Sequence, residues 1–204
     1  MIDIFKFDTL EAFRRPGCPL CRLVDDAMRQ WMDSFWREGR NAPAARRAFF
    51  AAGGFCRAHA FLLLDVAKGP RGAAAVVDVY TGLARVDLER LTQQAARLES
   101  SRRRHPTLSR ASRCPACVEE AGAVERKGAF FIDTLRDPVA QDLYLASDGV
   151  CYTHLEAAFA EAIADGDAEI ARFLVDDWRR RLGSVREQAA PKQIVSRYVG
   201  GQYG

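Results

Sequence analysis

The feature that most constrains this chain is a pattern of cysteines and histidines that occurs twice. The first copy is Cys18-Pro-Leu-Cys21 followed by Cys56-Arg-Ala-His59, and the second is Cys114-Pro-Ala-Cys117 followed by Cys151-Tyr-Thr-His154. The two motifs are separated by 34 residues in the first copy and by 33 in the second. All six cysteines and two of the three histidines belong to this pattern. Each copy therefore offers three thiolates and one imidazole, a complete ligand set for one metal ion.

Both kinds of motif are expected at the amino termini of helices, where the helix dipole favours negative charge. In Cys-x-x-His, a cysteine at the helix start and a histidine three residues later share one face. We expect the ligands of each half to meet: Cys18, Cys21, Cys56 and His59 in one site, and Cys114, Cys117, Cys151 and His154 in the other. A crossed arrangement, in which Cys18 and Cys21 meet Cys151 and His154, stays open but requires more global coincidence.

Zinc is the expected metal, with two ions per chain, because Cys3His is a common closed set for structural zinc. Four protein ligands leave no open position for water or substrate, which argues against a catalytic zinc. An iron–sulfur cluster at the same ligands is the alternative, since thiolates with an occasional histidine also hold clusters. A redox dithiol is less favoured because no βαβ pattern surrounds the motifs.

The hydrophobic periodicity predicts an all-α protein made of two pseudo-repeated four-helix halves, each organised around a Cys3His metal site. The eight expected helices begin near the CxxC motifs, at two prolines, at the CxxH motifs and after the following turns. Pro43 and Pro138 each stand 13 residues before a CxxH cysteine and are expected at first helical positions. Asp137 is the expected N-cap of the second of these helices. Residues 1–17 are expected to form an extended or partly helical lead-in.

We therefore divide the chain into a first metal-binding half (1–100), a basic linker (101–113), a second metal-binding half (114–190) and a C-terminal tail (191–204). The linker contains five arginines and no acidic residue. Such a segment can attract nucleic-acid phosphates, but no aromatic platform or DNA-reading motif accompanies it, so a solvated linker is favoured. His105 in this linker has no counterpart in the repeat and is expected to face solvent.

The remaining composition excludes several classes of function. The net charge of +3 is too small to indicate a polyanionic partner. Adjacent carboxylates, as in Glu119-Glu120 and Asp176-Asp177, point in different directions on a helix and are expected on solvated faces. No apolar run approaches the roughly 20 residues of a membrane span, and the amino terminus lacks a signal-peptide pattern. We expect a cytoplasmic protein with reduced thiols and without a membrane partner.

The chain resembles a bacterial family of unknown function that carries duplicated CPxC and GxCxxH units. The matching residues are Gly17-Cys-Pro-Leu-Cys-Arg-Leu23, Gly53-Gly-Phe-Cys-Arg-Ala-His59, Cys114-Pro-Ala-Cys117 and Asp148-Gly-Val-Cys-Tyr-Thr-His154. The resemblance implies a helical metal-binding protein and no particular activity. From the residues we expect a non-enzymatic, zinc-stabilised accessory or adaptor protein that contacts another protein. The alternatives are an iron–sulfur protein for electron transfer or metallocentre maturation, and a nucleic-acid-binding regulator.

Overall fold

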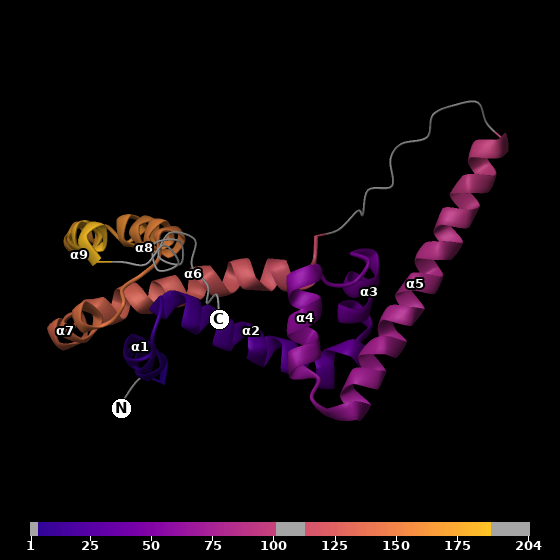
Figure 1. Ribbon diagram of the computed structural model, residues 1–204, viewed down its shortest axis with the longest axis horizontal. Coiled ribbons are helices and arrows are strands. Elements are labelled where there is room, and N and C mark those ends of the chain that lie inside the picture. The colour runs from indigo at the N-terminus through magenta and orange to yellow at the C-terminus, as the bar shows by residue number, and fades with distance from the viewer. Residues whose placement is uncertain (1–3, 101–112, 189–204) are drawn as a thin grey trace. The chain divides into compact units, whose positions relative to one another are not determined.

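The computed structural model describes residues 4–100 and 113–188, and these residues contain helices and no β-strand (Figure 1). The elements are α1 (Ile4–Arg14), α2 (Pro19–Arg37), the 3-10 helix η1 (Gly39–Asn41), α3 (Pro43–Ala51), α4 (Arg57–Val66), α5 (Gly69–Ser100), α6 (Pro115–Leu135), α7 (Pro138–Ala146), α8 (Tyr152–Ala164) and α9 (Ala168–Gln188). The predicted all-α class is confirmed. No helix of this described part is both long and apolar enough to cross a membrane.

The eight predicted helices correspond to α2 through α9. Pro43 and Pro138 are the first residues of α3 and α7, as their fixed φ favours. The Asp137 side chain accepts a hydrogen bond from the backbone amide of Val139 at 3.0 Å, so its predicted role as N-cap is confirmed. Residues 101–112 of the predicted linker, including His105, and the tail 191–204 lie outside the described residues. The repeat as a three-dimensional arrangement stays a prediction.

Helix α1 is a full helix where the sequence indicated only a lead-in. Its Ala12 and Phe13 side chains are buried, and Lys6 donates a hydrogen bond to Asp137 at 2.8 Å. These contacts are with residues distant in sequence, and tertiary packing supplies most of the stability of a helix this short. The amino-acid pattern of residues 4–14 alone was therefore not enough to predict this helix.

Contacts divide the chain into two compact units whose limits differ from the sequence halves. The terminal unit consists of Met1–Ala27 and Ala121–Gly204, and the central unit consists of Met28–Glu120. The boundaries fall inside α2 and α6, so each of these helices contributes its first turns to one unit and its remaining turns to the other. Each candidate metal centre described below lies wholly within one unit.

The core of the terminal unit is built around three aromatic side chains. The rings of Phe13, Phe131 and Tyr144 meet edge to face with centroids 5.6 to 5.8 Å apart, a favourable arrangement for aromatic pairs. Leu20 from the start of α2 and Leu135 from the end of α6 belong to the same buried cluster. This cluster joins α1, α2, α6, α7, α8 and α9 within the terminal unit.

The core of the central unit is also aromatic. The Phe55 ring packs against Phe35 and against Phe49, with centroids 4.9 Å apart in both pairs. Trp31 stacks on Phe35, and Tyr80 of α5 meets Phe49 edge to face. Phe55 directly precedes Cys56, so this packing fixes the position of a candidate ligand.

Candidate metal centres

The two CPxC motifs occupy equivalent places at the starts of long helices. Cys18 directly precedes α2, and Cys114 directly precedes α6. Each helix begins at the proline. Proline is favoured at the first helical position because the N–H that it lacks would have no acceptor within the helix. The backbone amide of Cys21 donates to Sγ of Cys18 at 3.4 Å. Such an amide donor would stabilise a metal-bound thiolate.

The two CxxH motifs are equally alike. Cys56 is the N-cap residue of α4 with φ −63° and ψ 168°, and Cys151 is the N-cap residue of α8 with φ −71° and ψ 165°. This extended conformation at a helix start places the histidine three residues later on the same side as the cysteine. Both histidines direct Nδ1 toward the cysteine sulfurs.

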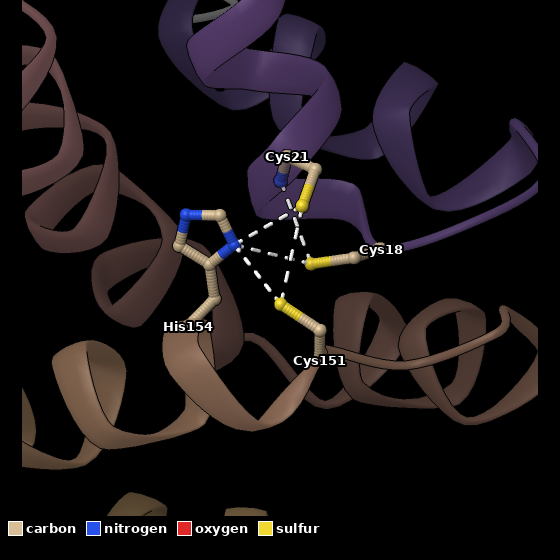
Figure 2. Close-up of side chains that lie close together, drawn as sticks. All are labelled: Cys18, Cys21, Cys151 and His154. Atoms are coloured by element: carbon tan, nitrogen blue, oxygen red, sulfur yellow. Dashed lines mark hydrogen bonds between the residues drawn. The ribbon is translucent and has the colours of Figure 1, made fainter. Parts of the chain in front are cut away.

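The first candidate centre lies in the terminal unit and joins the start of α2 to the start of α8 (Figure 2). Its residues are Cys18, Cys21, Cys151 and His154. Nδ1 of His154 lies 3.5 Å from Sγ of Cys18, 3.3 Å from Sγ of Cys21 and 3.3 Å from Sγ of Cys151. The sulfurs of Cys21 and Cys151 are 3.9 Å apart. We call this group centre 1.

The second candidate centre, centre 2, lies in the central unit and consists of Cys56, His59, Cys114 and Cys117. Nδ1 of His59 lies 3.2 Å from Sγ of Cys56, 3.9 Å from Sγ of Cys114 and 3.4 Å from Sγ of Cys117. The sulfurs of Cys56 and Cys117 are 3.6 Å apart. The backbone amide of Cys56 donates to Sγ of Cys114 at 3.3 Å.

Both groups fit a single tetrahedral ion. Metal–sulfur bonds of about 2.3 Å and metal–nitrogen bonds of about 2.0 Å place tetrahedral ligands about 3.8 Å apart for two sulfurs and about 3.5 Å for sulfur and nitrogen. The distances in both centres lie close to these values, and all four ligand atoms of each group lie within 4.8 Å of one another. A disulfide is not formed in either group, since all six cysteines are free.

The crossed pairing means that the favoured sequence prediction, in which each half holds its own site, is wrong. Phe55 holds the Cys56 segment against Phe35. Phe35 lies 14 residues beyond Cys21 on α2, which corresponds to about 21 Å of helical rise. Cys56 therefore cannot reach the Cys18–Cys21 turn while α2 remains helical.

The same constraint operates in the second half. The amide of Val150, which precedes Cys151, donates to the Tyr144 hydroxyl at 3.5 Å. The Tyr144 ring packs on Phe131, and Phe131 again lies 14 residues beyond the second cysteine of its CPxC motif, Cys117. The aromatic residue on each long helix thus directs the CxxH motif away from the CPxC motif of its own half.

The electrostatics of centre 1 show why a cation would be stabilising there. Hydrogen bonds from Cys18 and Cys21 lower the pKa of Cys151 to about 3, whereas burial raises the pKa of Cys18 well above its ordinary value. The cluster on its own thus concentrates negative charge on Cys151 and keeps Cys18 protonated. A bound dication would let all three sulfurs ionise together.

In centre 2 the pKa values of the cysteines are also shifted in opposite directions, and one of the cysteines is exposed. Burial, together with hydrogen bonds to the neighbouring thiols, raises the pKa of Cys117 to about 12. For Cys56 burial acts upward, but the hydrogen bond from the His59 amide and those from Cys117 and Cys114 leave its pKa lowered. Cys117 is exposed, whereas Cys151 of centre 1 is buried. The two centres therefore differ in access to solvent.

Asp148 and Gly17 join the two motifs of centre 1 directly. The backbone amide of Gly17 donates to the Asp148 carboxylate at 2.6 Å, and Gly17 itself has φ +90°. This bond connects the residue before Cys18 to the loop that carries Cys151. The glycine and the aspartate of the two sequence signatures thus have a shared structural role.

Gly149 allows an arginine of α9 to hold the Cys151 loop. Its φ is +71°, and a Cβ at this position would lie 2.5 Å from Nε of Arg181. Arg181 donates to the carbonyl of Ser147 at 2.7 Å and pairs with the buried Asp177 at 2.6 Å. The indole of Trp178 donates to the Val150 carbonyl at 3.1 Å. Helix α9 therefore holds both sides of the loop before Cys151.

Centre 2 is supported by apolar packing and one carboxylate instead. Gly54 has φ +89°, and a Cβ there would lie 3.0 Å from Leu83 and 3.3 Å from Tyr80 of α5. Nε2 of the buried His59 lies 3.6 Å from the Glu120 carboxylate. A carboxylate beside the free nitrogen of a ligating histidine orients the ring and raises its basicity.

We expect Gly149→Ala to destabilise the terminal unit and to weaken metal binding at centre 1. The substitution forces a side chain into left-handed backbone, at a cost of about 1–3 kcal/mol, and displaces Arg181. Urea unfolding and a competitive zinc titration measure the two effects. Gly183→Ala in α9 is the matched control, because its Cβ would meet nothing within 4 Å. Equal stability and metal affinity of the two variants would contradict this role of Gly149.

Sequence reasoning found all eight clustered residues but missed some that support them. Asp177 was predicted on a solvated face, which is wrong, because its side chain is 1% exposed. Its spacing of four residues from Arg181 is the signal that could have indicated an ion pair. Glu120 was also assigned to a solvated face, and its side chain is 48% exposed beside His59. Nothing local in the sequence distinguishes it from Glu119.

Comparison with known proteins places the chain in a family without supplying an activity. Neither the curated proteins nor the solved structures contain a significant match. A model of a family of unknown function, DUF6062, matches residues 2–179. The matched region covers both units in large part and includes all eight residues of the two centres. The chain therefore belongs to DUF6062, a family of unknown function.

Proposed function

We propose that this protein is a non-enzymatic, zinc-stabilised helical accessory protein with one structural zinc ion in each centre. The observation that carries the proposal is the pair of four-ligand Cys3His groups, each arranged around one point. A four-coordinate site of protein ligands alone has no position left for a substrate or an activated water. The two centres are therefore suited to holding protein segments together and not to catalysis.

The crossed pairing supports a structural role. Centre 1 brings together residues more than 130 positions apart in the sequence, and centre 2 brings together residues about 60 positions apart. A metal ion that closes such long loops restricts the unfolded chain more than one that closes a short loop. Each ion would also fix a helix start, where the helix dipole favours the net negative charge of three thiolates and a dication.

The ligand spacing favours a single ion over an iron–sulfur cluster. In a cluster, protein ligands bind different iron atoms and are separated by the cluster itself. The four ligand atoms of each centre lie within 4.8 Å of one another, which suits one tetrahedral ion. Thiolate and imidazole are ligands that zinc accepts readily.

An apolar face on α4 and α5 supports a role in contacts with another protein. Phe61, Leu64 and Val77 are 59%, 43% and 60% exposed, and they line a hollow of about 270 Å³ together with Tyr80. Exposed apolar patches are typical of protein–protein contact sites. We propose that the protein works in the cytoplasm, where its thiols stay reduced, and that this face contacts its partner.

Elemental analysis of protein purified without oxygen and without added metal tests the zinc assignment. We expect two zinc ions per chain and no visible absorption, since zinc with thiolates is colourless. Cys18→Ser and Cys117→Ser should each reduce the content to about one ion. Iron with sulfide and a visible charge-transfer band would replace the proposal by the cluster alternative. Protein that is folded but free of metal would reject both.

A further inference from the structure

A cavity in the central unit lies apart from both metal centres. It has a volume of about 320 Å³ and is bordered by the end of α2, η1, α3, α4 and α5. Phe35, Phe49 and Leu63 form part of its wall and are almost fully buried. The volume is at the lower end of the range for small-molecule sites, about 300–1,000 Å³. None of its lining residues belongs to centre 1 or centre 2.

Gly82 gives the cavity part of its width. This glycine lies in the middle of α5, where glycine is about 1 kcal/mol less favourable than alanine. It borders the cavity, and a Cβ added to it would meet nothing within 4 Å. A larger side chain would therefore have room at this position beside the cavity. No packing contact requires a glycine at this position. The absence of a side chain there leaves this edge of the cavity open.

Two opposite charges border the same cavity. Arg46 of α3 lies over the Phe50 ring, with the guanidinium carbon 5.5 Å from the ring centroid. Asp78 of α5 borders the cavity from another helix. In the described part of the chain, no ion pair joins either side chain to a partner. The cavity thus combines an aromatic wall with a guanidinium that has no carboxylate partner there.

We propose that this cavity binds a small carboxylic acid with an aromatic or branched apolar body. The apolar body would lie against Phe35, Phe49 and Leu63, where it is removed from water. The carboxylate would pair with Arg46, whose planar guanidinium matches a carboxylate through two parallel hydrogen bonds. Asp78 adds a place for an amino group, so an apolar α-amino acid belongs to the same class of ligand.

Three probes that share one ring separate these contributions. 3-Phenylpropionate carries only the carboxylate, phenethylamine carries only the ammonium group, and phenylalanine carries both. Calorimetric titration of the purified full-length protein should show 3-phenylpropionate binding with a Kd on the order of 0.1–1 mM, as expected for a ligand of this size. Phenylalanine should bind at least as tightly, because Asp78 can accept its ammonium group. Phenethylamine should bind more weakly than either.

Two variants with matched controls connect binding to the cavity. Arg46→Met should weaken 3-phenylpropionate binding by up to about 5-fold, because Arg46 is exposed and an exposed ion pair contributes about 0–1 kcal/mol. Arg47→Met is the control, because Arg47 is exposed on the same helix, as Arg46 is, but does not border the cavity. Gly82→Leu should block binding by filling the cavity, whereas Gly183→Leu adds the same side chain to an open position on α9. Thermal unfolding of all four variants shows that they fold.

The outcomes decide the proposal. The proposal is supported if Arg46→Met weakens binding of the two carboxylates, Gly82→Leu abolishes it, and both control variants leave it unchanged. Binding of phenethylamine alone would reject the carboxylate assignment. Binding that persists in Gly82→Leu would place the ligand elsewhere, and an absence of binding by all three probes to folded protein would overturn the proposal. None of these results depends on which metal the two centres hold.

Discussion

Removal of the zinc ions that we propose, with a strong chelator, is expected to lower the free energy of unfolding by about 5 kcal/mol or more. Structural zinc contributes on the order of 10 kcal/mol of apparent binding free energy to small domains that fold around it. Without a cation, burial keeps Cys18 protonated while Cys151 carries negative charge. The core that joins α1, α2 and α6–α9 includes Cys18 at its edge, so the loss should reach beyond the centre itself.

Urea unfolding followed by circular dichroism at 222 nm measures this effect. Reductant is present throughout, so that thiol oxidation does not imitate metal loss. Return of the original midpoint after addition of zinc is the control for reversibility. A midpoint that chelation leaves unchanged, in protein shown to have lost its metal, would rule out a structural role for the two centres.

Asp177→Ala is expected to have the largest effect of any single substitution away from the ligands. Its carboxylate is paired with Arg180 and, at 2.6 Å, with Nε of Arg181. Arg181 is 11% exposed and also donates to carbonyls at the end of α7. Removing one partner of a buried pair leaves the other charge uncompensated, which costs about 3–5 kcal/mol. Because Arg181 holds the loop before Cys151, metal affinity at centre 1 should fall as well.

Asp176→Ala is the matched control for this substitution. Asp176 precedes Asp177 on α9 and pairs with Arg179, but both side chains are more than 60% exposed. Exposed ion pairs contribute about 0–1 kcal/mol. Chemical unfolding and a zinc competition titration should therefore separate the two neighbours clearly. Similar losses in both variants would show that Arg181 does not depend on Asp177 for its position.

The sequence was sufficient for helices α2 to α9 and for the candidate ligands because both have local signatures. Proline at the start of α3 and α7, the Asp137 cap and the cysteine caps of α4 and α8 are each determined within a few residues. The spacing of CPxC and CxxH selects the same eight residues that the fold brings together. These predictions needed no knowledge of how distant segments pack.

The pairing of the motifs and the role of α1 were not predictable in this way. Both depend on contacts between distant residues, such as Phe55 with Phe35 and Phe13 with Phe131. The length of α2 could be predicted from its hydrophobic periodicity. That Cys56 lies too far from Cys18 and Cys21 follows only once Phe55 is known to pack near the end of that helix. The burial of Asp177 is of the same kind, since it follows from the packing of α9.

Protection of cysteines from alkylation in Cys151→Ser tests the crossed pairing most directly. The variant should keep one metal ion, and brief alkylation followed by mass spectrometry shows which thiols that ion protects. The crossed arrangement predicts that Cys21 reacts while Cys56, Cys114 and Cys117 stay protected. Reaction of Cys114 and Cys117 with protection of Cys21 and Cys56 would contradict it, and would return each metal ion to its own half of the sequence.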